Sequence, residues 1–189
     1  MFKLWLPIYG IMAVLTVSAA AGPSNWMIDP TKTRISFAID AVGWPKTVGI
    51  FHDFDGRISV DFDKPQQSRV TFKVRTGSVD VNSDVLASLI RSSAFFNTVK
   101  YPEATFVSTG IEKTSSKTVR VTGNLTFLGI TNSETFDVLV DARLAEKGRL
   151  GYKAMGSFDR SKYGMITGIP VVADAVQLEI TTEQYEKGN

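Results

Sequence analysis

The one histidine of this 189-residue chain, His52, precedes Asp53 and Asp55, and a carboxylate beside a histidine can orient a general base. Adjacent residues of a strand point to opposite faces, so His52 and Asp53 cannot easily pair there. We therefore expect His52 at the surface or at a strand end. Asp53 and Asp55 share a face, as do Asp61 and Asp63, and paired carboxylates can hydrolyse glycosides when they flank a cleft. Both pairs lie beside turn residues, where aspartate commonly forms local hydrogen bonds, so a hydrolase that uses Asp53 and Asp55 is only our third hypothesis.

Other reactive chemistry is scarce in the composition. The chain has no cysteine, which excludes disulfides, thiolate nucleophiles, iron–sulfur clusters and zinc fingers, and a single histidine excludes a metal site with two imidazoles. The net charge of +2 implies no basic field for nucleic acid. Serine-nucleophile elbows, phosphate-binding loops and calcium-binding loops are also missing from the sequence. We therefore predict a binding protein with no catalytic residues, no metal and no nucleic-acid partner.

The N-terminal segment has the pattern of a secretory signal peptide. Lys3 precedes an apolar run that ends in Ala19-Ala20-Ala21, the small residues that signal peptidases prefer. We expect residues 1–21 to be removed near Ala21, with Ala19 as the second position, and the domain to span residues 22–189. An uncleaved membrane anchor is the alternative, because the run is at the lower length limit for a membrane span. A periplasmic location is the first expectation, and secretion the second.

The rest of the chain alternates between apolar and polar residues with a period of two. The alternating sets are Ile35, Phe37 and Ile39; Ile58, Val60 and Phe62; Val70, Phe72 and Val74; Phe136, Val138 and Val140; and Val176, Leu178 and Ile180. Such alternation is typical of strands with one buried face. We count about eight strands, separated by turn-forming residues, which is the spacing of an all-β barrel or sandwich.

One segment has helical spacing instead. Between Ser83 and Ala94, the pairs Val85/Leu89 and Leu86/Ile90 are each four residues apart, and Asn82 or Ser83 is available as the N-cap. The apolar face of this helix needs a partner, and one end of the barrel would provide it. A barrel of about eight strands can be packed solid or can hold one elongated ligand, and the pattern alone does not choose.

Several pieces of the chain, in their order and spacing, resemble the YceI-like family of exported lipid-binding proteins. They are Trp26 with Asp29-Pro30, Val48-Gly49 with Asp53 to Gly56, Arg91-Ser92 with Phe95-Phe96-Asn97, Tyr101-Pro102, Val121-Thr122-Gly123, Arg160-Ser161 with Tyr163-Gly164, and Asp174 before the last strand. The resemblance covers nearly all of residues 25–183.

The resemblance implies an all-β, lipocalin-like, extended antiparallel barrel with an apolar tunnel and a short helix over one end. It also implies an isoprenoid or quinone-type lipid as the ligand, with no other cofactor. Transient contact with a membrane or a membrane cytochrome would be in keeping with the family, and the protein would be a monomer or a homodimer. The family often has a His where this chain has Thr33, and polar or ionisable residues where it has Leu86, Ala87 and Leu89, which leaves the head group of the ligand open.

We predict the tunnel-lining residues from strand parity and from the apolar helix positions. They are Phe37, Ile39, Phe72, Val74, Leu86, Leu89, Ile90, Phe106, Phe127, Phe136, Val138 and Phe158, and the resemblance adds Phe95 and Phe96 near the tunnel. A register slip of one residue would exchange the inner and outer sets. Our first hypothesis for function is an exported carrier of a long-chain isoprenoid or similar amphiphile. The second is an envelope stress or interaction domain with a packed core and no ligand.

Overall fold

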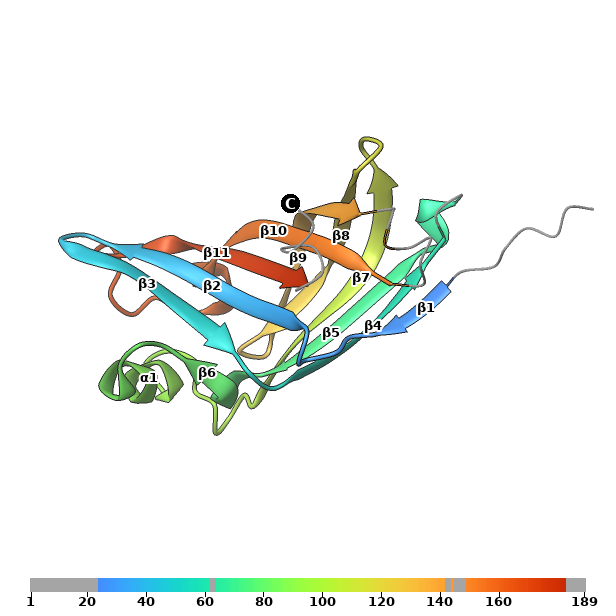
Figure 1. Cartoon of the computed structure of the whole chain (residues 1–189). Helices are drawn as coiled ribbons and strands as arrows, with labels where there is room; N and C mark the ends of the chain where they lie inside the picture. Colours follow the sequence, from blue (N-terminus) through green and yellow to red (C-terminus); the bar gives the residue numbers. More distant parts are fainter. Residues whose placement is uncertain (1–23, 62–63, 142–143, 145–148, 183–189) are drawn as a thin grey trace, which may run out of the picture.

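A single curled antiparallel sheet dominates the computed structural model, which describes residues 24–61, 64–141, 144 and 149–182 (Figure 1). Its eleven strands follow the order β1-β4-β5-β7-β8-β9-β10-β11-β2-β3-β6. The strands are β1 (Ser24–Met27), β2 (Thr33–Ala41), β3 (Trp44–Phe51), β4 (Phe54–Val60), β5 (Arg69–Arg75), β6 (Val79–Asp80), β7 (Glu103–Lys113), β8 (Thr118–Phe127), β9 (Ile130–Asp141), β10 (Gly151–Asp159) and β11 (Val172–Thr182).

The predicted all-β, lipocalin-like architecture is confirmed, as a half-barrel with eleven strands in place of about eight. The additional strands include β1 and β6, which have only four and two residues and lie at the two edges of the sheet. Strands this short show too little alternation to be recognised in a sequence. The predicted signal peptide, Phe62 and Asp63 lie outside the described residues.

Among the described residues, the outer side of β3 pairs only with β6, at Ile50 and Phe51, so most of this sheet edge has no strand beside it. Exposed strand edges can recruit other chains, and proline or lysine on the edge opposes such pairing. Pro45 and Lys46 occupy this stretch of β3 and are both exposed. The sequence therefore protects the open side of the half-barrel.

The predicted helix is α1 (Asp84–Arg91), which lies with β6 at one end of the sheet (Figure 1). Ser83 is its N-cap, and the Ser83 hydroxyl accepts a hydrogen bond from the Leu86 backbone N–H at 3.3 Å. Three short 3-10 turns, η1 (Pro65–Gln67), η2 (Thr76–Ser78) and η3 (Arg160–Tyr163), connect strands elsewhere. Within the described part of the chain, no helix is long and apolar enough to cross a membrane.

Candidate ligand-binding cavity

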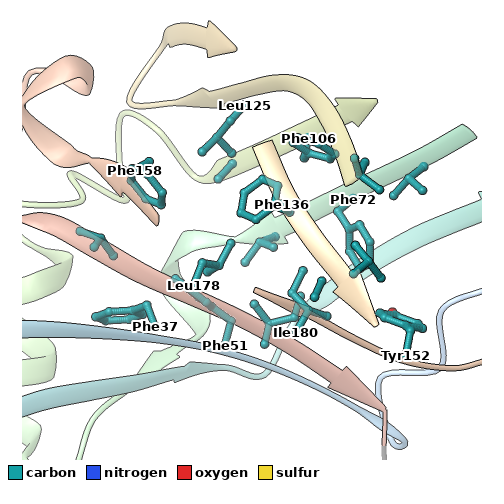
Figure 2. Close-up of a pocket in the computed structure, with 18 of the residues that line it drawn as sticks. Phe37, Phe51, Phe72, Phe106, Leu125, Phe136, Tyr152, Phe158, Leu178 and Ile180 are labelled. Carbon is teal, nitrogen blue, oxygen red and sulfur yellow. The ribbon is translucent and has the colours of Figure 1, made fainter. Parts of the chain in front are cut away.

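The concave side of the sheet encloses a cavity of about 730 Å³ (Figure 2). Its wall consists of alternate residues from the inner faces of the strands, such as Phe72 and Val74 of β5 and Leu178 and Ile180 of β11. Pockets for small molecules usually measure roughly 300–1,000 Å³, so this cavity has the size of a binding site. Period-two alternation explains why the wall is apolar, since every second residue of each strand points inward.

All of the predicted lining residues except Leu89 are in the wall of this cavity. They are Phe37, Ile39, Phe72, Val74, Leu86, Ile90, Phe95, Phe96, Phe106, Phe127, Phe136, Val138 and Phe158. The structure therefore brings these residues together on the inner side of the sheet.

The placement of Leu89 in the wall was wrong. Leu89 is 47% exposed and does not line the cavity, whereas Leu86 and Ile90 do. The helix carries two apolar pairs, and only the stripe of Leu86, Ala87 and Ile90 faces inward, while Val85 and Leu89 face solvent. Spacing of four residues places each pair on one face but does not say which face is buried.

Glycines on neighbouring strands explain why so many phenylalanines leave the cavity open. A Cβ atom added to Gly49 would overlap the Phe37 ring, and one added to Gly156 would overlap the Phe136 ring. Gly123 stands in the same relation to Phe106. Because each ring lies over a strand position without a side chain, the rings lie along the sheet, and the Phe106 and Phe136 rings meet edge to face at 5.3 Å between centroids. These glycine–phenylalanine pairs are not evident from the sequence, since they become neighbours only through strand register.

An aromatic cluster lies at the α1 end of the cavity. The Phe96 ring is 5.3 Å from Phe127, 6.0 Å from Phe37 and 6.1 Å from Phe51 between centroids. The segment after α1 places Phe96 there, with the Phe96 N–H donating to the Ile90 carbonyl at 2.8 Å. Edge and stacked pairs of this kind stabilise apolar interiors, and here they connect the helix to the sheet.

Arg160 is a buried charged residue of the wall, and its hydrogen-bonding capacity is largely used by the protein. Its guanidinium donates to the carbonyls of Met165, Thr167, Val172 and Ala173 at 2.8–3.0 Å. Burial lowers the pKa of Arg160, opposed by the nearby charge of Asp174. The guanidinium therefore holds the loop after η3 in place and is poorly available to an anionic ligand.

The opposite end of the cavity is polar. Lys113, Ser115, Ser116 and Lys117, from the end of β7 and the turn before β8, line the cavity there. Asp61 also lines this end and is buried, and its carboxylate accepts from the Lys64 backbone N–H at 2.7 Å. The cavity is thus an apolar tube with a polar mouth at this end, which suits a molecule with one long hydrocarbon part.

Three of the residues considered for catalysis, His52, Asp53 and Asp55, lie outside the cavity wall, whereas Asp61 lines it. His52, Asp53 and Asp55 are exposed, and the His52 Nε2 lies 3.4 Å from the Asp80 Oδ2 on the surface. Asp55 contacts Arg75 at 3.4 Å. His52 is therefore the surface residue that we predicted. Among the described residues, no three acidic, histidine or cysteine side chains gather as metal ligands.

Known proteins share both the sequence and the fold of this chain. A protein of Azotobacter vinelandii named UPF0312 is 31% identical over 192 residues, covering 97% of this chain and 98% of that one. Protein YceI of Salmonella arizonae is 29% identical over 188 residues, covering 95% and 96%.

Among solved structures, BcnA of Burkholderia cenocepacia is 25% identical with a TM-score of 0.73, covering 81% of this chain and 96% of its own. A polyisoprenoid-binding domain from Saccharophagus degradans has a TM-score of 0.61 at 14% identity, covering 84% and 95%. At that identity, the Saccharophagus structure shows only that the fold is shared.

The family model described as the YceI-like domain matches residues 26–184, which include every described strand from the second half of β1 to β11. The motifs from which the resemblance was inferred all lie within this range. This chain belongs to the YceI-like family.

Proposed function

We propose that the protein is an exported carrier that holds a long-chain isoprenoid or a similar amphiphilic lipid in the cavity. The observation that carries the proposal is the open apolar tube, kept open by the Gly49, Gly123 and Gly156 positions under the phenylalanine rings. The similarity of fold to a polyisoprenoid-binding domain agrees with it. The sequence of residues 1–21 supports export to the periplasm.

The shape of the cavity favours an elongated ligand. Tyr152 and Phe158 both line it from β10, and six residue steps along a strand span about 20 Å. Each buried CH₂ group contributes about 0.8 kcal/mol, so a few five-carbon units offset an association cost of roughly 4–15 kcal/mol without a charged anchor. Burial raises the pKa of Tyr152, so its phenol stays neutral beside the ligand.

The two alternative hypotheses are less well supported. A domain with a packed core does not account for a cavity of about 730 Å³, because unfilled apolar volume destabilises a fold. A hydrolase based on Asp53 and Asp55 does not account for the exposure of both carboxylates away from the cavity. We therefore propose binding without a catalytic step.

The direct test is to purify the protein from its native host, extract it with organic solvent and analyse the extract by mass spectrometry. Recovery of about one long-chain lipid per protein molecule is expected. Repeated native preparations without lipid, together with no binding of fluorescent isoprenoid analogues, would contradict the proposal.

A variant that fills the cavity tests the site itself. Val138→Phe adds a ring to the wall of the cavity, so we expect its affinity for a fluorescent isoprenoid analogue to fall about tenfold, the equivalent of roughly two buried CH₂ groups. Val107→Phe makes the same change on the outer face of β7, where Val107 is exposed, and should bind like the wild type. Equal affinities of the two variants would place the lipid elsewhere.

A further inference from the structure

The end of the molecule that carries the β2–β3 turn has an exposed apolar surface, which we call the apolar tip. It consists of Val42, Trp44, Ile166, Ile169 and Val171, with exposed fractions from 41% for Ile169 to 75% for Val42. The β2–β3 hairpin projects at this end of the sheet (Figure 1). Exposed apolar side chains gathered at one end of a molecule are typical of an interaction site.

Two segments far apart in the chain form the apolar tip, and hydrogen bonds hold them together. The Val42 N–H donates to the Val171 carbonyl at 2.8 Å and joins the two segments, while the Ile169 N–H donates to the Ile166 carbonyl at 3.2 Å within the second segment. The Arg160 guanidinium holds the same loop from inside, through the Thr167 and Val172 carbonyls. The apolar side chains are thus presented by a braced surface, which lowers the entropy lost on binding.

The apolar tip is continuous with the wall of the cavity. Ala41 and Val172 line the cavity, and they are the direct chain neighbours of Val42 and Val171. They are also paired with each other across β2 and β11. The apolar tip therefore adjoins the cavity wall at this end, whereas the polar mouth lies at the other end.

The charges that flank the apolar tip in the chain are paired with each other. Lys46 lies 3.4 Å from Asp40 across the hairpin, and Lys162 lies 3.0 Å from Asp159 beside the loop. These pairs leave no net charge that would select an anionic or cationic partner. Trp44 is a side chain that favours the interface between water and hydrocarbon.

From this combination we infer that the apolar tip docks on the surface of a lipid bilayer, with Trp44 and Ile166 inserted below the head groups. The occupant is a zwitterionic membrane surface, and the contact is driven by apolar burial. The docking goes beyond holding a lipid, and it places one end of the cavity against the source or destination of its contents.

The experiment measures partitioning of the protein, as recovered in soluble form from its host, onto phosphatidylcholine vesicles by flotation. Trp44→Ala and Ile166→Ala should each lower the partition coefficient, about tenfold for Trp44, because each removes a large inserted side chain. Met27→Ala is the matched control, since Met27 is 76% exposed on β1, outside the apolar tip, and Trp44 is 74% exposed. Partitioning should not change with salt.

Four results would overturn the inference. The first is that the wild type does not partition onto the vesicles, and the second is that Met27→Ala and Trp44→Ala lower the partition coefficient equally. The third is that binding requires anionic lipid and disappears in salt. The fourth is that the wild type is a dimer in solution and Trp44→Ala dissociates it. The last result would mean that a second copy covers the apolar tip. Lipid content measured by extraction is independent of these readings, so failure of the proposed carrier function is distinguishable from failure of docking.

Discussion

Single glycines control how far the phenylalanine rings reach into the cavity. Gly49 lies opposite Phe37 in the β2–β3 register, and the space above its Cα is filled by the Phe37 ring. Any side chain there must push the ring toward the middle of the cavity. The hollow interior thus depends on an absent Cβ as much as on the residues that line it.

We expect Gly49→Ala to lower the affinity for a fluorescent isoprenoid analogue about tenfold, because the displaced Phe37 ring takes up ligand space. The free energy of unfolding should fall by about 1–3 kcal/mol, the usual effect of overpacking. Titration with the analogue and chemical denaturation measure the two effects. Gly110→Ala is the control, since nothing lies within 4 Å of its added Cβ, and it should bind like the wild type. Equal binding by Gly49→Ala would show that the ring moves elsewhere.

At the scale of elements, α1 is a short helix whose position depends on its cap and on one apolar stripe. It contributes Leu86 and Ile90 to the cavity wall, and its N-terminus is capped by the Ser83 hydroxyl. A helix of eight residues is only marginally stable by itself, so these interactions determine whether the end of the cavity stays covered.

Ser83→Ala should destabilise α1 by about 0.5–2 kcal/mol, because the Leu86 N–H loses its acceptor. Hydrogen exchange of the amides of residues 84–91 should become faster, and release of a bound analogue should accelerate. Ser88→Ala, at an exposed position inside the helix, should have the opposite effect on exchange because alanine is the better helix former. Identical exchange in both variants would contradict this account of the cap.

The loop between η3 and β11 is held by a carboxylate as well as by Arg160. The Asp174 carboxylate accepts from the Ser161 N–H at 2.8 Å and from the Ser161 hydroxyl at 2.6 Å. These hydrogen bonds lower the pKa of Asp174, with smaller contributions from Arg160 and Lys162. A carboxylate with a lowered pKa stabilises the fold above its unfolded pKa, and this stabilisation is lost as the pH falls through the lowered value.

We therefore expect the loop to open in acid, below the ordinary aspartate pKa of 3.8. Hydrogen exchange at the Gly164 and Met165 amides, corrected for its intrinsic pH dependence, should report the opening. Asp174→Asn should lose most of this pH dependence. Asp29→Asn is the control, because it removes another carboxylate of lowered pKa that is far from the loop in the sequence, and it should retain the pH dependence. The same pH profile in Asp174→Asn would assign the acid sensitivity to another group.

At the scale of the whole molecule, the half-barrel has one apolar end, one polar end and an apolar tube between them. The open β3 edge and the cavity mean that the sheet is less completely packed than a solid sandwich. A bound lipid would supply the missing contacts, so the stability of the protein should depend on its occupancy.

Removal of the lipid should lower the unfolding temperature and the free energy of unfolding. A ligand present at about a hundred times its Kd stabilises the folded state by roughly 2.7 kcal/mol. Calorimetry before extraction, after extraction and after return of the same lipid measures the effect. Mass spectrometry of the extracted sample confirms that the lipid was lost. If the unfolding temperature of that sample were unchanged, the expected dependence of stability on lipid would be contradicted.

The sequence determined which residues of each strand share a face, because alternation has a period of two, and the structure decided that the predicted set faces the cavity. It also determined the helix, with Asn82 or Ser83 as its N-cap, and left the choice between these two residues to the structure. It could not assign Leu89 correctly, since the choice between two apolar stripes depends on how α1 rests against the sheet.

Only the tertiary structure decided that the interior is hollow and that one end is apolar. Both properties depend on residues that are distant in the chain and adjacent in space, such as Phe136 over Gly156 and Val42 bonded to Val171. The number of phenylalanines is the same for a filled core and for a lined tube. Strand register determines whether each ring meets a side chain or the bare backbone of a glycine, and that is the physical reason why composition and periodicity left the question open.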